Sequence, residues 1–262
     1  MVVPQTLKVF VHGNPETAAI WNDLVAELSR RGVDDVVCVS PPGFGAPVPD
    51  GFDGTAEAYR QWLADMLRSW GGDVDLVGHD WGAGHVFGVL AAQPELVRSW
   101  AADCAGLLHP EYEWHDMAQA WQAPEMGEQV VDAMVGMSHD DFVSAFAPLG
   151  MGTTIASLVR QGVDAEMGRC ILSLYRSAAQ PRMRELGDTF RARRPRNGLV
   201  VIAENDHYAG TDAMAAHLAV SVGASVARIP GCGHWWMVER PDLAADALIA
   251  HWESVGDGVQ SA

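Results

Sequence analysis

Short apolar runs alternate along the chain with longer segments in which apolar residues recur at helical spacing. A run such as Val74–Gly78 is largely apolar, as strands covered on both faces of a parallel sheet are. This alternation predicts an α/β protein with a mostly parallel sheet of about six strands, flanked by helices. The expected strands are Leu7–His12, Asp35–Ser40, Val74–Gly78, Arg98–Asp103, Leu199–Ala203 and Ser225–Ile229. The expected helices are Ala18–Arg31, Thr55–Trp70, Gly82–Ala92, Thr211–Val222 and Pro241–Ser254.

The alternation stops between Leu107 and Pro195, where no convincing strand pattern occurs. We interpret residues 107–195 as a helical cap inserted after the fourth strand, and residues 1–106 and 196–262 as the core. The insertion is rich in methionine and tryptophan. Such residues at helical spacing usually pack in a core, but in a cap they would also line a substrate pocket. The residues concerned are Met117, Trp121, Met126, Met134, Met137, Met151 and Met167.

Length and charge narrow the possible partners. The 262 residues, of which 48% are apolar, fit one domain of ordinary size with a full core. No apolar run is long enough to span a bilayer. The formal net charge of −17 repels phosphate and so excludes nucleic acid and anionic membrane as partners. A small neutral, apolar organic substrate is compatible with this charge, and the oligomeric state stays open.

The cysteines and the amino terminus indicate an intracellular protein without a metal centre. Cys38, Cys104, Cys170 and Cys232 form no C-x-x-C pair, and no histidine cluster has metal-ligand spacing. Free thiols in a reducing compartment are the expectation, with neither metal nor organic cofactor. The first residues lack the basic segment and cleavage site of a signal peptide. These features predict a cytoplasmic location.

The segment Gly78-His-Asp80-Trp-Gly82 carries the most specific chemical signal. It joins an apolar strand to a helix that begins with small residues, which is the pattern of a nucleophile elbow. The two glycines let strand and helix approach closely, and the residue between them lies at a helix N-terminus that favours negative charge. The nucleophile is therefore predicted to be the carboxylate of Asp80, in place of a serine or cysteine.

The base and its partner follow further along the chain. His234 lies after the last strand and before the final helix, where we expect the catalytic base. A third residue must orient the imidazole and stabilise its cation. Asp206, just past the fifth strand, is the favoured acid, and Asp103, at the end of the fourth strand, is the alternative.

Motifs along nearly the whole chain resemble one branch of the α/β-hydrolases. They are Val11-His-Gly-Asn14-Pro15, Pro41-Pro-Gly-Phe-Gly45, Gly78-His-Asp-Trp-Gly82 and Gly233-His234. The chain thereby resembles the haloalkane dehalogenases and epoxide hydrolases, which use an aspartate nucleophile. Relative to that family, the chain opens at what would be the third strand, so the first two strands of the family are missing.

The resemblance implies roles for three further residues. In the dehalogenases, the residues matching Asn14 and Trp81 donate side-chain hydrogen bonds to the departing halide. Tyr175 resembles a lid tyrosine that protonates the epoxide oxygen in epoxide hydrolases, although a similar Tyr-Arg pair occurs in dehalogenase lids. A second lid tyrosine is not found. Asn14 also has a purely structural interpretation, since an Asn-Pro dipeptide starts turns.

These residues predict a two-step reaction. Asp80 attacks a saturated carbon to form an ester, and water activated by His234 then hydrolyses it. Backbone N–H groups of Trp81 and Asn14 would stabilise the oxyanion. Asn14 favours a haloalkane dehalogenase, and an epoxide hydrolase is the alternative. A ligand-binding protein that keeps the fold without catalysis is a third, less favoured possibility.

Overall fold

A computed structural model describes residues 6–71 and 73–257 of the chain. Six parallel strands form one sheet in the order β2-β1-β3-β4-β5-β6. The strands are β1 (Leu7–Val11), β2 (Val36–Val39), β3 (Val74–Gly78), β4 (Ser99–Ala102), β5 (Gly198–Ala203) and β6 (Ser225–Ile229). Every predicted strand is found within one residue of its expected ends, which confirms the predicted sheet. Residues 1–5, which are part of the amino-terminal segment without signal-peptide features, lie outside the described residues.

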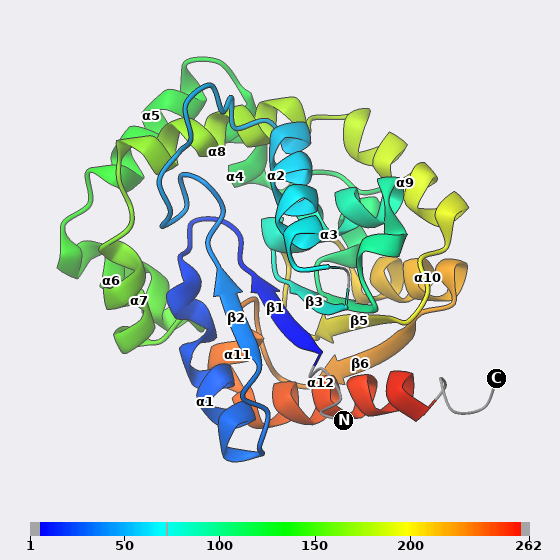
Figure 1. The fold of residues 1–262 in the computed structure, drawn as a ribbon. Helices are drawn as coiled ribbons and strands as arrows, with labels where there is room; N and C mark the ends of the chain where they lie inside the picture. Colours follow the sequence, from blue (N-terminus) through cyan, green and yellow to red (C-terminus); the bar gives the residue numbers. More distant parts are fainter. Residues whose placement is uncertain (1–5, 72, 258–262) are drawn as a thin grey trace.

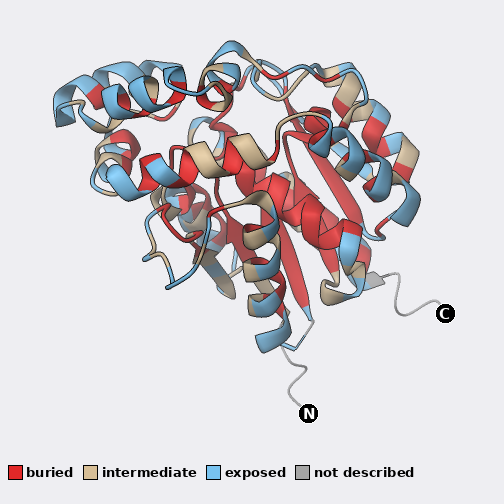
Figure 2. Ribbon diagram, turned by 90° about the horizontal axis from the view of Figure 1, so that it is seen from above, coloured by how far each residue is buried: buried red, intermediate tan, exposed pale blue. Residues whose placement is uncertain are grey.

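The strands in the middle of the sheet are more deeply buried than those at its edges. Every residue of β3 and of β5 is buried, whereas β2 and β6 expose residues at the two edges of the sheet. Helix α3 (Trp81–Ala92) is apolar all round and almost entirely buried, as expected for a helix covered on every side. Figure 2 shows these buried segments running through the middle of the protein, with the exposed residues on the outer helices.

Helices cover both faces of the sheet (Figure 1). On one face lie α1 (Asn22–Arg30), α11 (Trp236–Glu239) and α12 (Pro241–Asp257). On the other face lie α2 (Ala56–Ser69), α3, α9 (Arg182–Arg193) and α10 (Asp212–Val222). Short 3-10 helices occur at Ala18–Trp21, Pro94–Leu96, Ala105–Leu108 and Ala147–Leu149.

Capping residues explain where the predicted and observed helices differ by a residue. Thr55 and Thr211 were expected to begin helices, but each is the N-cap of one. Their hydroxyl oxygens accept hydrogen bonds from the backbone N–H groups of Ala58 and Met214, as threonine does at helix N-termini. Each helix therefore begins one residue later than predicted.

The segment between β4 and β5 is helical, and its described residues include no strand. Its helices are α4 (Asp116–Gln122), α5 (Met126–Val135), α6 (His139–Phe146), α7 (Thr153–Arg160), α8 (Ala165–Ser177) and α9. Figure 1 shows α4, α5 and α8 above the strands, with α6 and α7 at the left of the view. Helix α9 instead packs against α3, with Phe190 edge-on to Phe87 at 5.3 Å. No helix in the described ranges combines the length and apolar character that a membrane span requires.

Candidate active site

The G-x-D-x-G segment forms a sharp turn between β3 and α3. Asp80, at its tip, has φ 51° and ψ −122°, a conformation that costs energy for any residue with a side chain. A Cβ atom at Gly82 would lie 2.0 Å from the carbonyl oxygen of Val11, so only glycine allows α3 to approach β1 this closely. The turn holds the Asp80 side chain directly before the first turn of α3, where backbone N–H groups favour an anion.

The two oxygens of the Asp80 carboxylate have different neighbours. Oδ1 accepts a hydrogen bond from the backbone N–H of Asn14 at 2.7 Å. Oδ2 lies 3.7 Å from Nε2 of His234. Burial disfavours the ionised carboxyl and, although the charge of His234 opposes it, raises the pKa of Asp80 to about 6. Most Asp80 side chains are therefore ionised at pH 7, as a carboxylate nucleophile requires.

Gly13 brings the segment after the first strand close to Asp80. A Cβ atom on Gly13 would lie 2.1 Å from Oδ1 of Asp80 and 2.4 Å from the backbone nitrogen of Trp81. Oδ1 therefore lies near the amide nitrogen of Trp81 as well as the amide of Asn14. These are the two backbone groups expected to stabilise an oxyanion.

His234 lies between β6 and α11 and contacts Asp206. The Nδ1 atom of His234 is 2.9 Å from Oδ2 of Asp206, and Oδ1 of Asp206 accepts a hydrogen bond from the backbone N–H of Tyr208 at 2.9 Å. Burial disfavours the charge on Asp206, but the positive charge of His234 and their hydrogen bond lower its pKa to about 2. Burial also opposes protonation of His234, yet Asp206 outweighs it and the pKa of His234 is raised to about 9.

Asp103, the alternative acid, has other partners. Its Oδ1 accepts a hydrogen bond from the backbone N–H of Asp80 at 3.1 Å. Its Oδ2 accepts one from the indole N–H of Trp236 at 2.6 Å and also bonds Nδ1 of His79. The structure thus pairs Asp206, and not Asp103, with His234, and Asp103 instead bonds the backbone of Asp80.

A buried glutamate, which the sequence did not single out, extends this network. The Oε1 atom of Glu16 lies 3.1 Å from Nε2 of His79 and accepts a hydrogen bond from the indole of Trp235 at 2.6 Å. Burial opposes a charge on His79, but the carboxylates of Asp103 and Glu16 raise its pKa well above the ordinary value. The resulting cation lies 4.5 Å from the ring of His234, measured between centroids. Glu16 and His79 are 63 positions apart, so no local pattern could have paired them.

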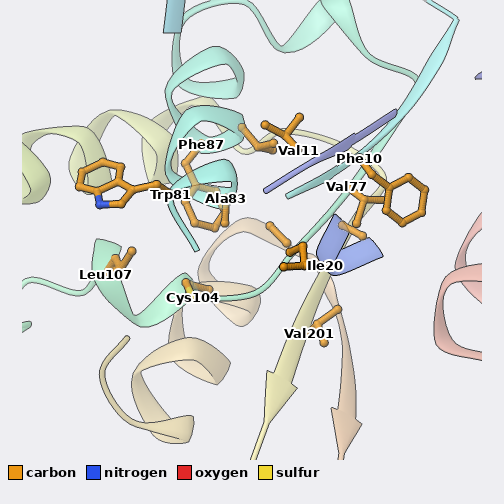
Figure 3. Packing of buried hydrophobic residues seen from close by; sticks show 14 of the residues in the cluster. Phe10, Val11, Ile20, Val77, Trp81, Ala83, Phe87, Cys104, Leu107 and Val201 are labelled. Atoms are coloured by element: carbon orange, nitrogen blue, oxygen red, sulfur yellow. The ribbon is translucent and has the colours of Figure 1, made fainter. Parts of the chain in front are cut away.

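Asn14, Trp81 and Tyr175 come together beside Asp80. The side-chain amide of Asn14 donates to the hydroxyl of Tyr175 at 3.4 Å, and the ring of Tyr175 is edge-on to Trp81 at 5.2 Å. Figure 3 shows the indole of Trp81 projecting from the start of α3, on the side away from Phe10 and Val77. Burial and the charge of Asp80 raise the pKa of Tyr175 well above its usual range, so this hydroxyl keeps its proton at neutral pH.

A cavity of about 400 Å³ is lined by Asn14, Asp80, Tyr175 and His234, whereas Trp81 borders a separate cavity of about 500 Å³ on the other side of its ring. The remaining walls of the first cavity are mostly apolar side chains from the inserted helices. The residues with polar groups that line it are Asn14, Asp80, His115, Tyr175, Tyr208 and His234. Most of the methionines named in the insertion take one of the two predicted roles, but the exposed Met126 takes neither, because it lies at the solvent-facing start of α5. The first cavity is lined by Met117, Met134 and Met137, together with Trp121. The fully buried Met151 and Met167 belong to the hydrophobic core.

Two groups in the described ranges contain donor atoms of the types that metals prefer. They are Glu16, His79 and His234, and Cys104, Asp206 and His234. Within each group, however, a histidine nitrogen already lies at hydrogen-bonding distance from a carboxylate oxygen. In both groups these side chains are therefore joined by hydrogen bonds.

Comparison with known proteins supports the fold and a hydrolase relationship. A haloalkane dehalogenase of Mesorhizobium japonicum is 28% identical over 166 residues, which cover 61% of this chain and 50% of that protein. The match thus spans about half the length of this curated relative. A mutant haloalkane dehalogenase from Agrobacterium tumefaciens superimposes with a TM-score of 0.72 at 19% identity, over 94% of this chain and 89% of that one.

The same architecture also occurs in an esterase. A thermophilic esterase from Thermogutta terrifontis matches with a TM-score of 0.72 at 16% identity, covering 96% of this chain and 90% of the other. At such identities the likeness concerns the fold, which hosts many reactions. The family model described as "Alpha/beta hydrolase family" matches residues 9–247. With its six-stranded parallel sheet and nucleophile elbow, the chain belongs to the alpha/beta hydrolase family.

Proposed function

We propose that this protein is a hydrolase that forms a covalent ester on Asp80, and that its substrates are haloalkanes. The observation that carries the proposal is the position of the Asp80 carboxylate, which lies at the tip of the elbow, in a largely apolar cavity, with Oδ2 3.7 Å from His234. Residues 107–195 act as the cap that forms much of this cavity. The relationship to a named haloalkane dehalogenase adds support.

In the first step, the carboxylate attacks the carbon that bears the halogen. Oδ1 is held by the amide of Asn14, so Oδ2 is the oxygen free to attack. Its electron pair forms the new carbon–oxygen bond, and the carbon–halogen bond breaks with its electron pair going to the halide. No base is needed, because Asp80 with a pKa of about 6 is already charged at pH 7.

In the second step, His234 removes a proton from water, and the hydroxide attacks the ester carbonyl of Asp80. The oxyanion forms on Oδ1, which the amide N–H of Asn14 already contacts. Formation of the ester also removes the negative charge of Asp80, which is one of the charges that raise the pKa of His234. Esterification therefore favours the neutral imidazole that can act as base.

The departing halide needs hydrogen-bond donors. The side-chain amide of Asn14 and the indole N–H of Trp81 are donors of this kind. Asn14 lines the cavity beside Asp80, its amide contacts the hydroxyl of Tyr175, and Trp81 packs against the ring of Tyr175. We expect these three groups to surround the halide as it forms.

An epoxide hydrolase is the second candidate, and one contact favours it. Because the hydroxyl oxygen of Tyr175 accepts a hydrogen bond from Asn14, its own O–H is available to donate to a substrate. An epoxide oxygen departs as an alkoxide and needs such a proton donor. In this reaction Tyr175 is the general acid and Asn14 orients it.

The two candidates are separated by a paired assay of bromide release from 1-bromobutane and diol formation from styrene oxide. We expect bromide release, with Asn14→Ala lowering its kcat/KM by about 100-fold, as the loss of a transition-state donor does. Diol formation that is abolished by Tyr175→Phe would reverse the choice. Tyr59→Phe is the matched control, because the Tyr59 hydroxyl bonds the carbonyl of Pro42 and does not line the cavity.

The covalent step has its own test. In a His234→Phe variant the ester should accumulate, and mass spectrometry should find the alkyl group on the peptide that contains Asp80. The double variant with Asp80→Asn should carry no adduct. Ligand binding without an adduct or turnover of any bromoalkane or epoxide would favour the non-catalytic binding protein.

A further inference from the structure

His115 is a polar residue of the cavity that none of the reaction steps uses. It is the N-cap of α4, and its Nδ1 accepts a hydrogen bond from the backbone N–H of Ala118 at 3.3 Å. A nitrogen that accepts from an amide carries no proton, so the neutral ring must hold its proton on Nε2. Burial also lowers the pKa of His115 and favours this neutral form. The backbone of α4 thus fixes His115 as a hydrogen-bond donor.

The ring of His115 is held in place by its neighbours. It is edge-on to Tyr208 at 5.3 Å and to Trp121 at 6.3 Å, measured between ring centroids. The loop before α4 is tied to the loop after β5, because the hydroxyl of Tyr112 donates to the backbone carbonyl of Tyr208 at 3.0 Å. A donor fixed in this way loses little conformational entropy when a ligand binds to it.

His115 is adjacent to the His234 side of the cavity, and Trp121 packs against both His115 and Tyr175, with ring centroids 6.3 Å and 4.7 Å away. Tyr208 is edge-on to His234 as well as to His115, at 5.3 Å from each. Tyr175 lies instead beside Asn14 and Trp81. Within residues 6–71 and 73–257, Nε2 of His115 has no hydrogen-bond partner, although the residue lines a cavity whose walls are mostly apolar. Binding sites commonly use such isolated polar groups to orient a ligand.

We infer that the Nε2–H of His115 binds a hydrogen-bond acceptor on the substrate, so that the preferred substrates carry an ether, carbonyl or hydroxyl oxygen beyond the reacting carbon. This inference rests on the proposed function, since it places the reacting carbon at Asp80. The apolar walls hold the carbon chain, Asn14 and Trp81 receive the leaving group, and His115 selects the distal oxygen. A wholly apolar substrate offers this donor no acceptor.

The experiment compares substrates of equal length that differ by one ether oxygen. The pairs are ω-methoxy-1-bromoalkanes and 1-bromoalkanes of the same number of heavy atoms, over a series of lengths. The wild type should prefer the ether at one length or more, and His115→Asn should lower the ether-to-alkane ratio of kcat/KM about 3- to 10-fold, the value of one neutral hydrogen bond. Asparagine keeps the N-cap but cannot reach as far.

Two further variants guard against indirect effects. His115→Phe keeps an aromatic ring between Tyr208 and Trp121 but removes the donor, so its ratio should fall as in the asparagine variant. His139→Asn is the matched control: His139 is an exposed histidine of the insertion that bonds Asp140 and Ser157, and the ratio should stay at the wild-type value. A ratio that is the same in the wild type and in both His115 variants at every length would overturn the inference.

Failure of the proposed function is recognised separately by a binding measurement. Calorimetry with the unreactive alcohols of the same series, such as 4-methoxybutan-1-ol and hexan-1-ol, measures the contribution of His115 without turnover. An ether preference that His115→Asn removes, in a protein that releases no bromide, would refute the dehalogenase and keep the binding role. Bromide release with no ether preference in either assay would refute the binding role alone.

Discussion

Asp80 combines two unfavourable features that an ordinary surface aspartate lacks. Its φ is positive and its carboxyl group is buried, with the pKa raised to about 6. Both features are tolerated because the surrounding structure, namely β3, α3 and the close contact at Gly82, holds the turn in this conformation. The same burial leaves a weakly solvated carboxylate facing apolar space, which suits attack on a carbon of an apolar substrate.

The raised pKa of Asp80 predicts how ester formation depends on pH. A protonated carboxyl is not a nucleophile, so the rate should fall as pH drops below about 6. At pH 5 the ester should form at about a tenth of its rate at pH 8, following the ionised fraction. The bromide burst in rapid-quench experiments measures this step. A burst rate that stays constant from pH 8 to pH 5, with the fold intact by circular dichroism, would contradict it.

The two candidate acids predict different losses. Asp206→Asn removes the anion that orients His234 and raises its pKa, so we expect kcat to fall about 100-fold or more while the alkyl ester accumulates. Asp103→Asn instead leaves the buried His79 cation with one carboxylate fewer and should lower the free energy of unfolding by about 3–5 kcal/mol. Single-turnover kinetics and chemical denaturation distinguish them. Accumulation of ester in the Asp103 variant, but not in the Asp206 variant, would exchange their roles.

How far the site could be predicted depends on how local each signal is. Asp80 stands in a five-residue pattern whose geometry follows from its glycines, so the sequence alone was enough to place it in an elbow. Asp206 and Asp103 could not be separated with certainty, because both follow adjacent parallel strands and thus lie at the same edge of the sheet. Only the loop after β5 turns Asp206 towards His234. Glu16 depends on partners distant in sequence and leaves no local pattern.

The strands could also be predicted better than the helices of the insertion, because their signals in the sequence are local and strong. The strands were predicted almost to the residue because runs such as Val74–Gly78 are buried along their whole length and so consist largely of apolar side chains. The individual helices of the insertion were not predicted. Helix α4, for example, has only seven residues and is capped by His115, a residue type seldom used for this role. Its start carries no strong signal in the sequence.

The close contact between β1 and the start of α3 requires a residue without a side chain at position 82, and this requirement can be tested. In Gly82→Ala, the new Cβ would meet the carbonyl of Val11 at 2.0 Å, so α3 must move away from β1. We expect the free energy of unfolding to fall by about 1–3 kcal/mol. Ester formation should also be lost, because Asp80 moves with the start of α3. Thermal and denaturant unfolding measure the first effect, and trapping of the adduct measures the second.

Gly256→Ala is the matched control for this substitution. Gly256 lies in α12, where a Cβ has no heavy atom within 4 Å, and alanine favours a helix. The free energy of unfolding of the Gly256→Ala variant should therefore not fall. Equal losses in the two variants would show that the close contact at Gly82 is not what the elbow requires.

Across the protein as a whole, the acidic surface and the apolar cavity act on the substrate together. The formal charge of −17 comes from 34 acidic against 17 basic residues. Glu16, Asp80, Asp103 and Asp206 add carboxylates at or just beneath the cavity, and in the described part of the chain His79 and His234 are the cations that contact them. A substrate that is itself an anion meets repulsion on approach and again beside Asp80. A neutral substrate meets no such repulsion, and its apolar surface can pack against the apolar walls of the cavity.

This predicts discrimination between two molecules of nearly the same shape, 4-bromobutanamide and 4-bromobutanoate. The neutral amide should have a kcat/KM at least about 10-fold higher at low ionic strength, because the field of the protein lowers the local concentration of the anion. The ratio should shrink as salt rises from about 0.01 M to 0.15 M, since the screening length falls from about 30 Å to 8 Å. Bromide release above that of an enzyme-free control measures both substrates, because the carboxylate of the anion also displaces its own bromide by forming a lactone. A preference for the anion, or a ratio that does not respond to salt, would mean that a local cationic group receives the carboxylate and that the acidic field does not govern entry.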